Sequence, residues 1–308
     1  MRLTAPVVAS TILAVAASLA AQTPLVKEDR PFRSGIELTS VAATVTDSEG
    51  RLITGLDRAA FEVFEDGIKQ EVTQFTRERV PIGLGVLIDI SDSMFGQRIK
   101  DARAAVNRFL FELLDGSDEF FIVAFNHAPK TLTGWTHTPD EVSRALNGLT
   151  PFGGTAAYDA IIEALPMIER RTRQRAALLV ISDGADTASN TSLREVKSAL
   201  LRSDAFVYAI AIDSSDRKAI NTRINPDALR EITGQSGGRT EVVHNSADLD
   251  EASARIAEEL NHQYVLGYSS PHEGDGRYHS IRVRVAGSDY RVRARNGYVA
   301  TPIHRRTQ

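Results

Sequence analysis

Alternation between apolar and amphipathic segments over residues 81–262 constrains the fold of this chain more than any other feature. The apolar segments LGVLIDI, EFFIVAF, AALLVIS and AFVYAIAI are continuous, which is typical of strands buried on both faces. Between them, segments such as QRIKDARAAVNRFLFELL space their apolar residues as a helix does, and TPDE at 138–141 has the pattern of a helix capping box. This order predicts an α/β fold, a doubly wound and mostly parallel sheet covered by helices.

The segments on either side of this region have the two-residue alternation of antiparallel strands. Asp66-Gly67 lies between two such runs and has the composition of a tight hairpin turn. Near the end, HSIRVRV and YRVRARNGY alternate apolar residues with arginines, and we expect residues 287–289 to join them as a hairpin. Neither flank is long enough to bury a core alone, so we expect one β-sandwich built from residues 36–80 and 263–300, around a domain at 81–262.

Arginines mark the outward positions of the last two predicted strands. If these strands pair, the arginines form one basic face consisting of Arg282, Arg284, Arg291, Arg293 and Arg295. Such a face suits an acidic polymer or the other domain. A solvated polar face is nevertheless ordinary on an antiparallel sheet and is the favoured interpretation.

Residues 1–21 have the organisation of a cleavable secretory signal peptide. A positive charge at the second position precedes the apolar stretch Val7–Leu19, and SLA is a small-x-small cleavage sequence. Because the stretch is shorter than the ~20 residues that span a bilayer, a membrane anchor is disfavoured. We expect export to the periplasm or out of the cell, with residues 22–35 as a linker or arm and 301–308 as a tail.

The composition excludes several classes of site. The chain has no cysteine, which rules out disulfides, thiolate metal sites and a lipid-anchored cysteine. Its seven histidines show no zinc-binding spacing. A formal net charge of −4 over 308 residues creates no field that would attract nucleic acid or an anionic membrane. We therefore expect no nucleic-acid partner and no membrane span after signal removal, while the oligomeric state is left open.

Five oxygen-bearing side chains are predicted to meet at one edge of the sheet. Asp89, Ser91 and Ser93 follow the first strand, Asp183 follows AALLVIS, and Thr155 comes after two glycines just before a helix. In an open parallel sheet, ligands bind beyond the carboxyl ends of the strands, where strand order reverses. Hydroxyls and carboxylates are hard ligands, so the set suits Mg²⁺, or Mn²⁺, which ligand type does not distinguish from it.

These residues resemble the metal-ion-dependent adhesion site of von Willebrand factor type A domains. All five motif positions match, as DISDS at 89–93, the threonine of FGGT and the aspartate of SDG. The resemblance implies that the three hydroxyls approach the metal, that the two carboxylates contribute directly or through water, and that a protein partner's carboxylate completes the octahedron. The flanks are similar to secreted von Willebrand factor A related proteins of acidobacteria, which implies no defined activity.

Enzymatic alternatives fit these residues less well, so we expect a binding protein without catalytic activity. A phosphatase of the haloacid dehalogenase type needs a second carboxylate where this chain has Ser91. A dinucleotide site needs G-x-G-x-x-G, and the loop after the first strand has one glycine. Gly234–Gly238 matches the G-x-S-x-G of esterases but follows a predicted helix, not a strand. The other non-enzymatic alternative is a structural envelope protein with a vestigial metal site and contacts through its sandwich.

Overall fold

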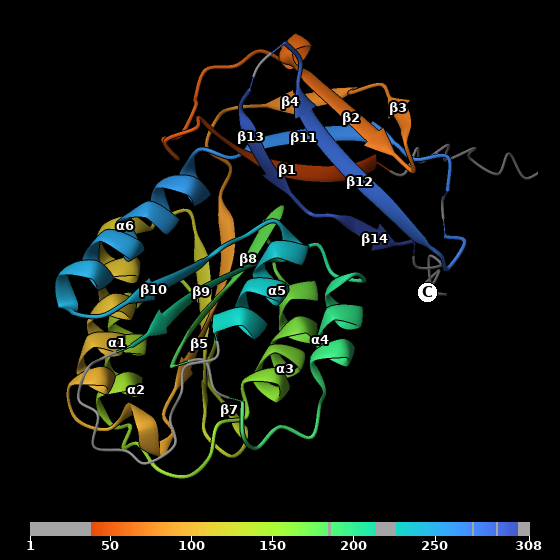
Figure 1. Cartoon of the computed structure of the whole chain (residues 1–308). Helices are drawn as coiled ribbons and strands as arrows, with labels where there is room; N and C mark the ends of the chain where they lie inside the picture. Colours follow the sequence, from red (N-terminus) through yellow and green to blue (C-terminus); the bar gives the residue numbers. More distant parts are fainter. Residues whose placement is uncertain (1–37, 184–185, 214–225, 273, 288, 301–308) are drawn as a thin grey trace, which may run out of the picture. The chain divides into compact units, whose positions relative to one another are not determined.

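The computed structural model describes residues 38–183, 186–213, 226–272, 274–287 and 289–300 (Figure 1). The predicted signal peptide, the linker at 22–35 and the tail at 301–308 lie outside the described residues. Their assignments therefore stay predictions.

A six-stranded sheet in the order β10-β9-β8-β5-β6-β7 forms the centre of the α/β region (Figure 1). Its strands are β5 (Ile82–Asp89), β6 (Glu119–Phe125), β7 (Pro129–Thr136), β8 (Arg175–Ser182), β9 (Phe206–Ile212) and β10 (Thr240–Val243). All neighbours are parallel except β7, which pairs antiparallel with β6. The strands β5, β6, β8 and β9 are buried along their whole length, as their continuous apolar sequences predict.

Helices cover both faces of this sheet and enclose two apolar cores. One core includes residues of α1 (Gln97–Arg108) with its π-helical extension Phe109–Leu113, α2 (Pro139–Asn147) and α6 (Ser246–Asn261). The other includes residues of α3 (Ala157–Glu169), α4 (Leu193–Leu200) and α5 (Pro226–Ser236). Among the described residues, none of the helices combines the length and apolar character needed to cross a membrane.

Two four-stranded antiparallel sheets, β13-β1-β11-β4 and β14-β12-β2-β3, form the second part of the structure. Their strands are β1 (Leu38–Thr46), β2 (Phe61–Glu65), β3 (Ile68–Gln70), β4 (Gln74–Thr76), β11 (Tyr264–Ser269), β12 (Tyr278–Val285), β13 (Arg291–Ala294) and β14 (Gly297–Val299). Each sheet combines strands from both ends of the chain, and one apolar cluster lies between them. The predicted fold class is therefore confirmed, while the exact domain boundaries stay a prediction.

The sandwich packs at the amino ends of the parallel strands. Arg175, the first residue of β8, donates hydrogen bonds to the backbone oxygen of Val80 and to the side chain of Gln263. Gln263 in turn donates to the hydroxyl of Tyr208 at 3.1 Å, and Ala42 of β1 belongs to the apolar core of the α/β region. The carboxyl ends of the strands consequently point away from the sandwich.

The Asp66-Gly67 turn forms as predicted. Asp66 has φ 49° and Gly67 has φ 81°, the left-handed conformations of a type I′ hairpin turn, and they join β2 to β3. The Gly234–Gly238 segment likewise ends α5 and leads into β10, with Gly237 at φ 90°. It is a helix terminus and not a nucleophile elbow.

The predicted hairpin around residues 287–289 is wrong. β12 pairs with β2 and β14, whereas β13 pairs with β1 in the opposite sheet, so the chain crosses the sandwich between them. Alternation determines which face of a strand is buried but not which strand pairs with it. The five arginines therefore form no single face: Arg284 lies over the ring of Phe64, and Arg293 pairs with Glu259 at 2.6 Å.

Two smaller expectations also change. The helix begins at Pro139 as predicted, but the side chain of Thr138 makes no cap hydrogen bond. The amide of Thr138 donates to the hydroxyl of Thr136, and this hydroxyl donates to the Glu141 carboxylate, so the reciprocal bonds of a capping box do not form. A complete capping box occurs at Ser192 and Glu195. The antiparallel edge strand β7 was not predicted, because register shifts in its pairing with β6 interrupt the alternation that would reveal it.

Candidate metal centre

The strand order places two of the predicted ligands side by side. The chain runs from β5 to β6 on one side and later returns to β8 on the other, so the order reverses between β5 and β8. Asp89 is the last residue of β5, and Asp183 follows the last residue of β8. Both carboxylates therefore lie at the switch point, where parallel α/β sheets bind ligands.

Asp89 forms the floor of this site and is fully buried. Its Oδ1 accepts a hydrogen bond of 2.8 Å from the amide of Ser91, and its Oδ2 accepts one of 2.6 Å from the hydroxyl of Ser182. Burial raises the pKa of Asp89 to about 7, and the nearby charge of Asp183 adds to the shift while these hydrogen bonds oppose it. The contact of Ser182 with Asp89 was not predicted, because a serine at the end of a strand is too common to indicate a functional role.

The two serines meet in the loop after β5. The Oγ atoms of Ser91 and Ser93 lie 2.9 Å apart, and Ser93 sits in a short 3₁₀ helix. Arg98 of α1 donates a hydrogen bond of 2.9 Å to the backbone oxygen of Ser93 and lies 3.5 Å from Oδ2 of Asp183. Arg98 thus balances part of the negative charge of Asp183. No local sequence motif indicates this contact.

Thr155 lies in a third loop and is buried. Its backbone oxygen accepts hydrogen bonds from the amides of Thr187 and Ala188, at 2.8 and 2.9 Å. The amide of Asp92 donates to the backbone oxygen of Gly153, at 2.9 Å. These bonds tie the loops that carry the serines, Thr155 and the segment after Asp183 to one another.

The donor set fits a hard divalent cation. Asp183 is only 1% exposed, yet its buried Oδ1 has no hydrogen-bond partner among the described residues. A buried carboxylate oxygen left without a partner is costly, and a cation would satisfy it. Asp186 follows in the next part of this loop and has a structural role, since its carboxylate accepts from the amide of Tyr158 and the hydroxyl of Ser189.

Two exposed aromatic side chains flank this centre. Phe95, at the end of the 3₁₀ helix, is 73% exposed, and Phe152, just before the glycines of the Thr155 loop, is 53% exposed. The amide of Phe152 donates to the backbone oxygen of Ile90 at 2.9 Å, which fixes it beside the first loop. Sequence reasoning did not select either residue.

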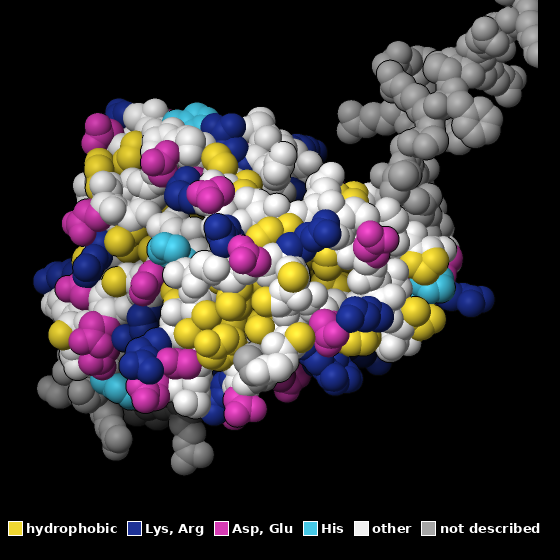
Figure 2. Space-filling view, turned by 90° about the horizontal axis from the view of Figure 1, so that it is seen from above, with side chains coloured by type: hydrophobic (Ala, Val, Ile, Leu, Met, Phe, Trp, Pro, Cys, Tyr) yellow, Lys and Arg dark blue, Asp and Glu magenta, His cyan; other side chains and the backbone are white. Residues whose placement is uncertain are grey.

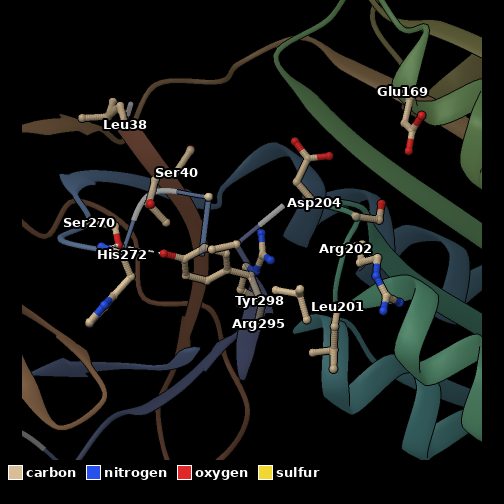
Figure 3. Close-up of a pocket in the computed structure, with 15 residues that line it drawn as sticks. Leu38, Ser40, Glu169, Leu201, Arg202, Asp204, Ser270, His272, Arg295 and Tyr298 are labelled. Carbon is tan, nitrogen blue, oxygen red and sulfur yellow. Dashed lines mark hydrogen bonds between the residues drawn. The ribbon is translucent and has the colours of Figure 1, made fainter. Parts of the chain in front are cut away.

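A pocket of about 360 Å³ lies elsewhere, between the sandwich and the α/β region (Figure 3). Its lining includes Ser40 and Tyr298 from the sandwich and Arg202 and Asp204 from the loop after α4. None of the five predicted ligands lines it.

Comparison with known proteins agrees with this geometry. A sequence model of the von Willebrand factor type A domain matches residues 84–185, which span the loops of the candidate centre from Asp89 to Asp183. The chain contains a von Willebrand factor type A domain. This finding confirms the family resemblance. The ligand set and the acidobacterial relationship stay predictions.

Relatives of this type A domain occur in proteins of different size. The chain is 25% identical over 125 residues to inter-alpha-trypsin inhibitor heavy chain H4 of Bos taurus, covering 37% of this chain and 14% of that protein. Among solved structures, BatB from Bacteroides thetaiotaomicron has a TM-score of 0.50 at 22% identity and covers 58% of this chain and 97% of its own. A von Willebrand factor type A protein from Catenulispora acidiphila has a TM-score of 0.53 at 12% identity, covering 83% and 75%.

Proposed function

We propose that this protein is an exported, non-enzymatic binding module that captures an acidic group of a protein partner through a divalent metal ion. Asp89, Ser91, Ser93, Thr155 and Asp183 would hold Mg²⁺ or Mn²⁺, and the partner's carboxylate would complete its coordination. The observation that carries the proposal is the buried Oδ1 of Asp183, which has no hydrogen-bond partner in the described part of the chain, at the same switch point of the sheet as a pair of serine hydroxyls.

The family and the surface around the site support a protein partner. Type A domains are protein-interaction modules that often bind a divalent metal. Phe95 and Phe152 present two aromatic side chains beside the centre, and aromatic residues are enriched where proteins meet. On the opposite face, which Figure 2 shows from above the sandwich, acidic and basic side chains are interspersed, in line with the small net charge.

Selection from a displayed random-peptide library in the presence of Mg²⁺, with elution by EDTA, tests this function. We expect enrichment of peptides containing Asp or Glu, loss of binding when that acid is changed to its amide, and loss of binding to the Asp89→Ala variant. Phe95→Ala should weaken binding of the selected peptides. Phe111→Ala, which removes an exposed aromatic side chain on the extension of α1, should leave their binding unchanged. Enriched peptides without an acidic residue, or binding that resists EDTA, would contradict the proposal.

A further inference from the structure

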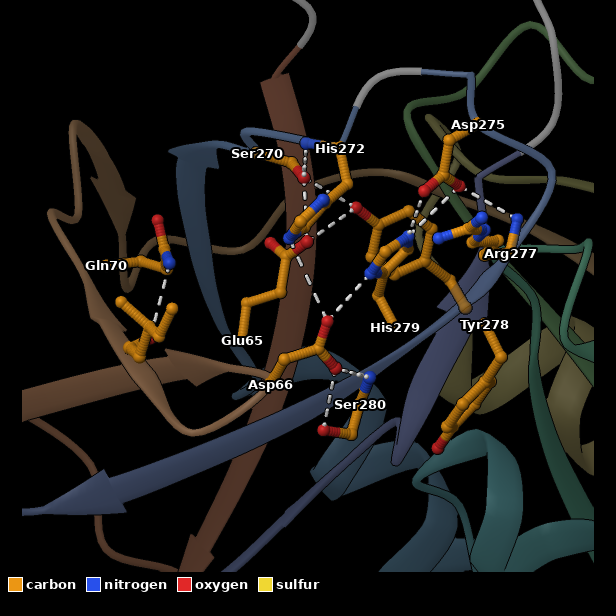
Figure 4. A network of polar contacts seen from close by, with 12 residues as sticks. Glu65, Asp66, Gln70, Ser270, His272, Asp275, Arg277, Tyr278, His279 and Ser280 are labelled. Carbon is orange, nitrogen blue, oxygen red and sulfur yellow. Dashed lines mark hydrogen bonds and ion pairs between the residues drawn. The ribbon is translucent and has the colours of Figure 1, made fainter.

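A second group of metal-binding side chains lies in the sandwich, far along the sequence from the type A domain motif. Glu65 ends β2, His272 lies in the loop after β11, and His279 belongs to β12. Each offers a ligand atom, and these three atoms all lie within 4.8 Å of one another. Figure 4 shows the three side chains gathered between the β2–β3 turn and the loop that precedes β12.

Glu65 is the observation that hydrogen bonding alone does not explain. The residue is 1% exposed, and its Oε1 accepts from the hydroxyls of Ser270 and Tyr298, at 2.7 and 3.1 Å. Its Oε2 is equally buried yet has no hydrogen-bond partner within the described part of the chain. The hydroxyl of Tyr268 lies beside this carboxylate, and burial together with its hydrogen-bonding contact to Glu65 raises the pKa of that hydroxyl. A buried carboxylate beside two imidazoles, with one oxygen that the hydrogen bonds of Ser270 and Tyr298 leave unsatisfied, suits a cation.

The two histidines differ in how they are held. The ring of His272 makes no side-chain hydrogen bond with the described residues and stacks on His279, with centroids 4.2 Å apart. His279 has a carboxylate at each nitrogen: Oδ2 of Asp66 is 2.8 Å from Nδ1, and Asp275 is 3.1 Å from Nε2. A metal ion would have to replace one of these carboxylates at its nitrogen, and the carboxylate left on the other nitrogen would then be the usual outer-shell partner of a metal-binding histidine.

We infer that Glu65, His272 and His279 bind a divalent transition-metal ion, with Zn²⁺ as the best match. Imidazole and carboxylate donors suit zinc, and tetrahedral coordination brings donor atoms to about 3.4 Å from one another, so small side-chain movements close the observed separations. Asp66 is placed to join them, since its Oδ2 also lies 3.9 Å from Nε2 of His272. The ion would fasten the loop after β11 to the β2–β3 turn, next to the pocket that His272 lines (Figure 3).

Calorimetric titration of the full chain with Zn²⁺ tests this inference. The protein is first stripped with chelator and dialysed, and Mg²⁺ is kept in millimolar excess so that the centre at Asp89 does not take up zinc. We expect one zinc per chain for the unsubstituted protein, and binding weaker by about 100-fold or more for His272→Ala, which removes a part-exposed ligand. Glu65→Gln keeps the shape of the buried side chain and should weaken zinc binding in the same way.

Two variants separate this site from other sources of zinc binding. His244→Ala removes a surface histidine that also lies beside an aspartate, Asp213, and should bind zinc like the unsubstituted protein. Asp89→Ala should also keep its zinc, so failure of the type A domain centre and failure of this site give different results. No zinc uptake at micromolar concentration, equal uptake by His272→Ala, or loss of uptake in Asp89→Ala would each overturn the inference.

Discussion

Replacing Asp89 with asparagine should stabilise the metal-free protein at neutral and alkaline pH. Burial raises the pKa of Asp89 from 3.8 to about 7, so the folded state favours the protonated side chain. The penalty for an ionised Asp89 is absent below pH 4, grows as the pH rises, and is complete above pH 7. A shift of roughly three pKa units corresponds to about 4 kcal/mol of folding free energy. Asparagine has the same shape and carries no charge, so it removes this penalty.

Urea unfolding of both proteins in EDTA, at pH 5 and at pH 8, measures this difference. The other carboxylates and histidines titrate alike in the two proteins and cancel from the comparison. We expect Asp89→Asn to be more stable by roughly 1.5 kcal/mol at pH 5 and by about 4 kcal/mol at pH 8. Added Mg²⁺ should stabilise only the unsubstituted protein. An advantage that does not change with pH, or a less stable variant at pH 8, would refute the account of the buried carboxylate.

Two further substitutions probe the contacts around the site and the end of α5. Arg98→Gln should tighten Mg²⁺ binding by about threefold to tenfold in calorimetry, because the guanidinium competes with the metal for Asp183; weaker binding would contradict this. Gly238→Ala should lower the free energy of unfolding, measured with denaturant, by roughly 3–5 kcal/mol. The new Cβ would overlap the backbone oxygen of Val207. Its control, Gly234→Ala, has open space within the helix and should stabilise the protein by ~0.5–1 kcal/mol.

Much of the fold could be predicted because burial leaves a local pattern. Continuous apolar segments indicated a central sheet. Because Asp89 comes at the end of the first of these segments, its place at the edge of the sheet could also be predicted. The alternation in β12 correctly identified its buried face. It did not identify its neighbours, because pairing depends on where other strands lie, and β12 and β13 proved to belong to different sheets.

The parts of the candidate sites that sequence reasoning missed are contacts between residues far apart in the chain. Ser182 bonds to Asp89 across 93 positions, and Arg98 approaches Asp183 across 85. The cluster of Glu65, His272 and His279 could not be recognised from histidine spacing, because Glu65 lies at the other end of the chain. It joins the two histidines only through the pairing of β2 with β12. Such sites become visible once the strand order is known.

Titration of the chelator-stripped chain with Mg²⁺ and with Mn²⁺ by calorimetry tests the central claim most directly. The account predicts saturable binding at one site that is lost in Asp89→Ala and kept in His272→Ala. Absence of saturable binding at millimolar metal, or equal binding by the Asp89→Ala variant, would contradict it.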